Sequence, residues 1–175
     1  MNYATIKWYD IANGEGVRIS LFVSGCTHRC KNCFNQVAWD FAYGTPFDEG
    51  IQQKIIKELA SPFIAGLSLL GGEPFEPQNQ AALLPFLREV KRLFPEKPIW
   101  CYTGCVLNEQ TGLFHDSNKN TSDTKEMLSL IDVLIDGPYV EELHNIRLKF
   151  RGSSNQRVID LKKTLSSSAC VLYME

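Results

Sequence analysis

Short apolar runs alternate along the chain with segments of helical periodicity. Four runs rich in branched apolar residues predict buried strands, at residues 17–24, 66–74, 98–104 and 131–138. Three segments space their apolar residues by three and four positions, which predicts helices at residues 50–60, 80–94 and 122–130. Strands that are apolar throughout and alternate with helices are typical of a parallel sheet built from strand–helix units.

The length of the chain limits how far such a sheet can extend. A complete eight-fold barrel typically needs about 250 residues, whereas this chain has 175. At about 30 residues a unit, we predict an α/β fold with a partial, open β/α barrel of about five to six parallel strands. No repeat or linker divides the chain, so we expect a single domain over residues 1–175. The polar residues 108–123 interrupt the pattern and predict a long surface loop.

Composition and charge exclude several classes of function. The formal net charge is −2, so no basic field directs the chain towards nucleic acid or anionic lipid. The amino terminus lacks the basic start and long apolar run of a signal peptide, and no apolar stretch reaches the length of a membrane span. We therefore expect a soluble, cytoplasmic protein that binds neither nucleic acid nor a membrane.

Three of the six cysteines are closely spaced, in a C-x3-C-x2-C pattern at Cys26, Cys30 and Cys33. In a reducing compartment, clustered thiols bind metal more often than they form disulfides. Short spacings let one loop wrap an iron–sulfur cluster, and three ligands leave one iron free to bind a substrate. A zinc site would instead need a fourth ligand, for which the candidates are His28, Cys101, Cys105 and His115.

Unusual residues stand at the carboxyl ends of all four predicted strands. The cysteine loop follows the first strand, GGEP (residues 71–74) the second and Thr103 the third, while Asp136 ends the fourth. Because the carboxyl ends of parallel strands share the edge of the sheet where ligands bind, we expect these groups to lie together. The two glycines allow a ligand to approach the backbone, and Glu73 offers an acceptor to an ammonium group. A plain Gly-Gly turn with a solvated glutamate is the alternative.

Together these motifs resemble those of the radical S-adenosylmethionine enzymes. The three-cysteine pattern after the first strand and GGEP after the second are specific to that superfamily. Longer stretches resemble the activating components of anaerobic ribonucleoside-triphosphate reductases, a subgroup of the glycyl-radical-enzyme activases. These stretches are GEGVRISLFVSGCTHRCKNCFN, DVLIDGPY and RGSSNQRVIDL. The similarity covers about residues 8–161 and weakens after Cys105.

The resemblance implies two cofactors. Cys26, Cys30 and Cys33 would hold a [4Fe–4S] cluster whose fourth iron binds the amino and carboxylate groups of S-adenosylmethionine. The resemblance assigns Gly71, Gly72, Glu73 and Pro74 to the methionine ammonium of S-adenosylmethionine. It assigns Asn35, Thr103 and Asp136 to other parts of the same cofactor site. No further catalytic side chain is implied. One-electron cleavage would yield a 5′-deoxyadenosyl radical that removes a Cα hydrogen from a glycine of the reductase, with flavodoxin or ferredoxin as the type of reductant.

The stretch RGSSNQR (residues 151–157) has two interpretations. Arginines separated by serine and asparagine are suited to a carboxylate, a phosphate or a protein surface, whereas a polar turn would need no ligand. The stretch is also a marker of the reductase-activating subgroup. It therefore predicts that the reductase is bound by Arg151, Ser153, Asn155 and Arg157.

Other functions remain open on the sequence. A formate-lyase-type activase or a small-molecule-modifying radical enzyme would share the cysteine pattern and GGEP, but the short chain and RGSSNQR argue against both. A non-catalytic metal-binding module would have no use for GGEP, and an electron carrier normally fills every cluster ligand. We therefore predict the reductase activase.

Overall fold

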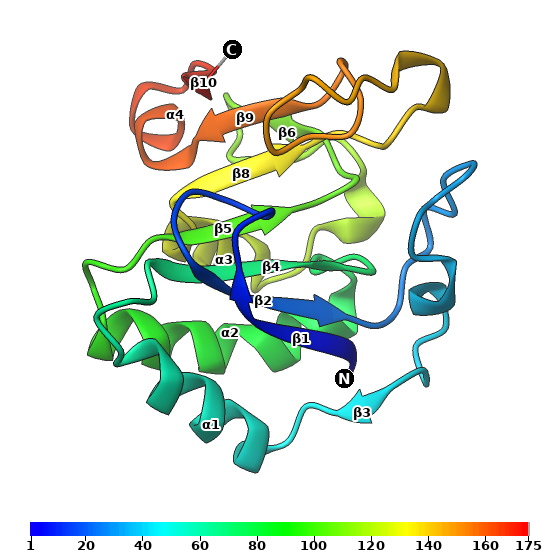
Figure 1. The fold of residues 1–175 in the computed structure, drawn as a ribbon. Helices are drawn as coiled ribbons and strands as arrows, with labels where there is room; N and C mark the ends of the chain where they lie inside the picture. Colours follow the sequence, from blue (N-terminus) through cyan, green and yellow to red (C-terminus); the bar gives the residue numbers. More distant parts are fainter. Residues whose placement is uncertain (175) are drawn as a thin grey trace.

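The computed structural model describes residues 1–174 and has an eight-stranded sheet in the order β10-β9-β8-β5-β4-β2-β1-β3 (Figure 1). The strands of this sheet are β1 (Asn2–Asp10), β2 (Arg18–Val23), β3 (Thr45–Pro46), β4 (Gly66–Gly71), β5 (Ile99–Tyr102), β8 (Val133–Asp136), β9 (Arg157–Asp160) and β10 (Leu172–Met174). A separate hairpin consists of β6 (Leu107–Asn108) and β7 (Leu113–Phe114).

Helices pack against one face of the sheet, as Figure 1 shows. They are α1 (Glu49–Leu59), α2 (Pro77–Leu93), α3 (Thr124–Leu130) and α4 (Leu161–Ser167), with single 3-10 turns at Gln36–Trp39, Ser117–Lys119 and Glu141–Leu143. The Asp48 side chain caps α1 by accepting the N–H of Ile51, and Pro77 occupies the start of α2. Within residues 1–174, no helix is both long enough and apolar enough to cross a membrane.

The predicted partial barrel of five to six parallel strands is wrong. The four central strands β2, β4, β5 and β8 pair in parallel, but every other neighbouring pair of the mixed sheet is antiparallel. Between β8 and β9 the chain forms only one 3-10 turn, so it lacks the crossover that a parallel connection requires. At the other side of the sheet, β1 pairs antiparallel with β2 and was not predicted from the sequence.

The sheet face opposite the helices carries a second apolar cluster, formed by Trp100, Val133, Ile135 and Val158. Loops cover this face. Asn13, from the loop between β1 and β2, accepts a hydrogen bond from the Ser68 hydroxyl at 2.6 Å. The Phe150 ring packs edge-on against Trp100 with the ring centroids 5.1 Å apart. This face is therefore covered by loops that pack against the sheet, and no helical layer of the described chain closes it.

The polar segment 108–123 is more structured than the sequence suggests. Its β6–β7 hairpin buries Phe114, whose ring lies edge-on to Phe75 with the centroids 4.6 Å apart. The Asn120 side chain bonds both the N–H and the carbonyl of Phe114, at 3.0 and 2.8 Å. These contacts fix the segment so that Lys119 lies in the interior, where it is 5% exposed.

Candidate cluster and cofactor site

A cavity of about 480 Å³ opens at the carboxyl ends of the four parallel strands. In Figure 1 the cysteine loop and the orange loop between β8 and β9 flank this edge at the right. All four strand ends singled out from the sequence contribute to the cavity wall, the fourth through Gly137 and not through Asp136. The predicted site residues that line it are Cys26, Cys30, Cys33, Gly71, Gly72, Glu73, Thr103 and Arg151.

The three motif cysteines fit a cluster better than a single metal ion. All three thiols are free and partly buried. Thiolates around one tetrahedral zinc lie less than about 4 Å from one another, because each Zn–S bond is about 2.3 Å. Among residues 1–174 the three cysteines form no such compact group. Burial raises the pKa of the Cys26 thiol to about 11, so cluster assembly has to displace a proton there.

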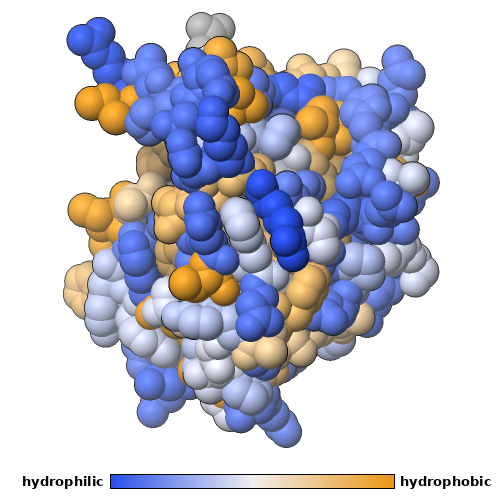
Figure 2. All heavy atoms as spheres, turned by 90° about the vertical axis from the view of Figure 1, so that its right-hand side faces the viewer, coloured by the Kyte–Doolittle hydropathy of each residue, from blue (hydrophilic) through white to orange (hydrophobic). Residues whose placement is uncertain are grey.

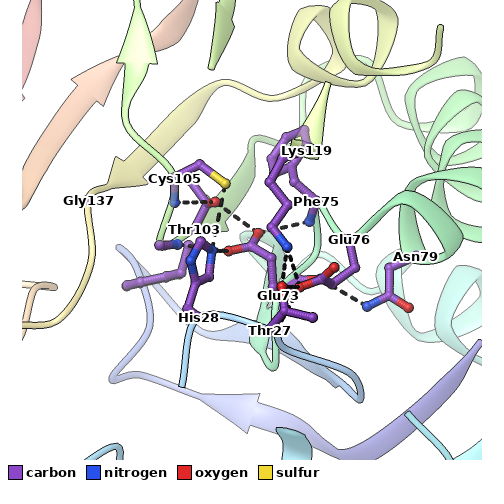
Figure 3. Close-up of polar contacts among 12 residues, drawn as sticks. Thr27, His28, Glu73, Phe75, Glu76, Asn79, Thr103, Cys105, Lys119 and Gly137 are labelled. Atoms are coloured by element: carbon purple, nitrogen blue, oxygen red, sulfur yellow. Dashed lines mark hydrogen bonds and ion pairs between the residues drawn. The ribbon is translucent and has the colours of Figure 1, made fainter. Parts of the chain in front are cut away.

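Glu73 joins the cysteine loop to the ends of β4 and β5 (Figure 3). Its carboxylate is 1% exposed. One oxygen accepts the Phe75 N–H and the Thr103 hydroxyl, and the other accepts the Gly104 N–H and His28 Nε2, each at 2.8 Å. Four donors saturate a carboxylate, so Glu73 acts here as a buried anchor.

His28, Glu73 and Cys105 form the one compact set of potential metal ligands in the described part of the chain, with the ligand atoms within 4.8 Å of one another. The set is held by hydrogen bonds. Burial raises the pKa of the Cys105 thiol far above its usual value, so this thiol stays protonated. Burial lowers the pKa of His28, but the hydrogen bond to Glu73 outweighs this and leaves that pKa raised. His28 therefore serves as a donor that supports the cysteine loop.

Two glycines permit the close approach of the loop to the strand ends. A Cβ atom on Gly72 would lie 2.5 Å from the carbonyl oxygen of Gly25. A Cβ atom on Gly104 would lie 2.7 Å from the His28 ring. Because neither position has room for a side chain, both contacts depend on glycine.

A buried ion pair holds the cysteine loop at a second point (Figure 3). Glu76 accepts the N–H and the hydroxyl of Thr27, at 2.8 and 2.7 Å, and pairs with Lys119 at 2.6 Å. Lys119 also donates to the Thr27 hydroxyl. Burial alone would raise the pKa of Glu76, but its bonds to Lys119 and Thr27 outweigh this and lower it, so the carboxylate is ionised.

This ion pair was not predicted from the sequence. Glu76 directly precedes the helix-starting Pro77, a position where a carboxylate is favoured, and this signal could have drawn attention to it. Lys119 offers no comparable signal, because it belongs to a polar segment whose neighbours are exposed.

We expect Lys119→Met to destabilise the apoprotein by about 3 kcal/mol, because it leaves the buried Glu76 carboxylate without its cation. Urea unfolding measures the change. The matched control is Arg88→Met, which breaks the exposed ion pair of Arg88 with Glu126 and should leave the unfolding midpoint nearly unchanged. Equal shifts of the midpoint in the two variants would contradict a structural role for the buried pair.

Three residues assigned to the cofactor by resemblance are not part of the cavity lining: Asn35, Pro74 and Asp136. Asp136 is 1% exposed and accepts the Arg157 guanidinium at 2.9 and 2.5 Å and the Leu107 N–H at 2.8 Å. Arg157 also pairs with Glu109 at 2.5 Å. These contacts tie β8 to β9 and to the β6–β7 hairpin, so both side chains are engaged inside the protein.

The RGSSNQR stretch folds back on its own backbone. The Gln156 side chain accepts two backbone N–H groups of the stretch and donates to the Gly137 carbonyl at 3.0 Å. Asn155 donates to the Pro138 carbonyl at 2.8 Å, and Ser153 is fully buried. Of the four residues predicted to bind the partner, Arg151 is the one that lines the cavity. The stretch therefore supports the loop between β8 and β9.

Comparison with known proteins finds relatives over most of the chain. A family model described as a 4Fe-4S single cluster domain matches residues 12–159. The anaerobic ribonucleoside-triphosphate reductase-activating protein of Haemophilus influenzae is 45% identical over 158 residues, which cover 89% of this chain and 96% of that protein. The protein of the same name from Escherichia coli K12 is 38% identical over 164 residues, 93% of this chain and 100% of the relative. The protein of the same name from enterobacteria phage T4 is 38% identical over 158 residues, which cover 90% of this chain and 93% of that protein.

Proposed function

This chain belongs to the family of anaerobic ribonucleoside-triphosphate reductase-activating proteins, and we propose that it activates such a reductase as a radical S-adenosylmethionine enzyme. When bound, a [4Fe–4S] cluster and S-adenosylmethionine supply the one-electron cleavage whose radical product removes a hydrogen atom from a glycine of the reductase. The observation that carries the proposal is the convergence of Cys26, Cys30 and Cys33 with the GGEP segment on one cavity.

The backbone after β4 supports a place for the methionine end of S-adenosylmethionine. Because four donors of the protein saturate the Glu73 carboxylate, we assign the ammonium group to the backbone of this segment. In the described residues no donor reaches the carbonyl oxygen of Gly72, a residue of the cavity wall. A free carbonyl beside the motif cysteines is suited to an ammonium group.

Thr103 and Asp136 are proposed to act on the cofactor indirectly. The Thr103 hydroxyl donates to Glu73 and accepts the Cys105 N–H at 3.0 Å, so it holds the end of β5 in place. Asp136 does the same at the end of β8 through Arg157. Both residues thus keep two strand ends at the spacing that the cavity requires.

The shape of the site supports a macromolecular substrate. A radical that abstracts hydrogen from carbon has to be generated beside its target, so the glycine must reach the interior of the cavity. On the side away from the helices, the cavity is bordered by the loops between β1 and β2 and between β8 and β9. The electron is proposed to come from a small carrier protein such as flavodoxin or ferredoxin.

Anaerobic reconstitution tests the function. Protein loaded with iron and sulfide is reduced with dithionite, mixed with S-adenosylmethionine and analysed for 5′-deoxyadenosine. We expect this product, and a glycyl radical in the EPR spectrum once the cognate anaerobic reductase is added. If protein with a loaded cluster yields no 5′-deoxyadenosine, the proposed radical S-adenosylmethionine activity is contradicted. A radical on a formate-lyase-type partner but none on the reductase would assign the chain to another activase class.

A further inference from the structure

We propose that Ile11, Phe34 and Ile146 form an apolar docking rim at the cavity mouth, which holds the reductase segment on either side of the target glycine. The inference rests on the proposed function and adds to it the surface that receives the partner. The occupant is a protein loop with apolar residues flanking its glycine.

The first observation is unusual exposure. Ile11 is 76% exposed, Phe34 84% and Ile146 88%. Among residues 1–174, five large hydrophobic side chains are at least 74% exposed, and the other two are Tyr9 and Phe63. Single exposed apolar residues are common, but three on loops that line the same cavity mark a contact surface.

The second observation is their placement on three separate loops. Phe34, beside Cys33, lines the cavity itself. In the loop between β1 and β2, Ile11 directly precedes the lining residues Ala12 and Asn13. In the loop between β8 and β9, Ile146 lies between the lining residues His144 and Leu148. Each of the three side chains therefore belongs to a different loop that lines the cavity.

An ion pair between two of these loops supports this arrangement. Lys31 of the cysteine loop pairs with Glu142 of the loop between β8 and β9 at 3.0 Å, on the surface. The contact keeps the loops that carry Phe34 and Ile146 next to each other. Figure 2 looks onto this edge of the molecule and shows hydrophobic side chains separated by hydrophilic ones. Such a surface suits contacts at several points around an opening better than one flat interface.

The nature of the occupant follows from the opening and from the charges beside it. An inserted glycine loop must pass the rim on both sides of the glycine, so apolar contacts there would hold it without obstructing the glycine. Arg147, directly after Ile146, and Lys149 of the same loop are exposed and basic, and Arg151 lines the cavity. The acidic Glu142 of this loop is already paired with Lys31. An acidic residue close to the glycine would complete the match with this rim.

The test separates cofactor cleavage from radical transfer. We expect Ile146→Asp and Ile11→Asp to retain wild-type 5′-deoxyadenosine formation in the absence of reductase. The glycyl radical yield on the reductase at limiting concentration should fall by at least about tenfold, and excess reductase should partly restore it. The matched control is Phe63→Asp, whose side chain is 83% exposed in the loop between α1 and β4. This variant should match the wild type in both assays.

Three results would overturn the rim alone. One is a wild-type radical yield in both rim variants. Another is a loss of cofactor cleavage without reductase, which would place these residues in the cofactor site. The third is a wild-type dimer, seen by gel filtration, that the rim variants disrupt without any change in radical yield; the surface would then join two copies of this chain. A wild-type protein that cleaves the cofactor but forms no radical on the reductase would overturn the proposed function itself, and the rim with it.

Discussion

Replacing any one of Cys26, Cys30 and Cys33 with alanine is expected to reduce cluster loading to background and to abolish cleavage of S-adenosylmethionine. Each thiolate holds one iron, and no other cysteine lines the cavity to take its place. Iron and sulfide content after anaerobic reconstitution, together with visible absorbance, measures the loading. The 5′-deoxyadenosine assay measures the cleavage.

The remaining cysteines provide the controls. Cys170 is exposed near the carboxyl terminus, so Cys170→Ser should load a normal cluster. Cys101 is fully buried in the core on the helix side of the sheet, so Cys101→Ala should lower stability while iron binding persists. A Cys101→Ala protein that folds but binds no iron would refute the assignment of three cysteine ligands.

Glu73→Gln is expected to have the second largest effect: a loss of about 3 kcal/mol of apoprotein stability, because a buried donor is left facing another donor. Each carboxylate oxygen accepts one backbone N–H, from Phe75 on one side and from Gly104 on the other. Whichever way the glutamine amide turns, its NH2 group therefore meets a backbone N–H. Urea unfolding of the apoprotein measures the loss, and Glu96→Gln, at an exposed position, is the control.

Cofactor affinity decides between two roles for Glu73. As an anchor, Glu73 affects S-adenosylmethionine only through the fold, so the variant should lose stability and affinity together. Thr103→Val removes one of the four donors and should show a smaller loss of both. A Glu73→Gln protein with wild-type stability and no affinity for S-adenosylmethionine would show instead that the carboxylate contacts the cofactor.

Local sequence signals predicted the central part of this structure. Apolar runs identified β2, β4, β5 and β8, because strands covered on both sides are largely apolar. The outer strands carry no such signal. Residues of β1 alternate between partly buried and exposed, and the direction of β9 depends on a connection whose path the sequence does not specify. The barrel prediction therefore failed at the edges, where long-range pairing decides the topology.

Strand pleating explains why Asp136 points away from the cavity. Side chains along a strand alternate between the two faces, so Asp136 shares a face with Leu134 of the helix-side core, and Ile135 faces the other way. Applying this alternation to residues 131–138 would have predicted the orientation. The contact of Glu76 with Lys119 could not be predicted in this way, because it joins residues 43 positions apart.

The two anchors of the cysteine loop have a consequence for repair. Glu73 holds His28, and Glu76 with Lys119 holds Thr27, and all of these contacts are made by protein atoms alone. The conformational entropy of Thr27 and His28 is therefore lost during folding and not during metal insertion. A cluster destroyed by oxygen would leave behind a loop whose first residues are still held beside the strand ends. Activity could thus be recovered by assembling a new iron–sulfur cluster on the existing chain, without refolding or synthesis of new protein.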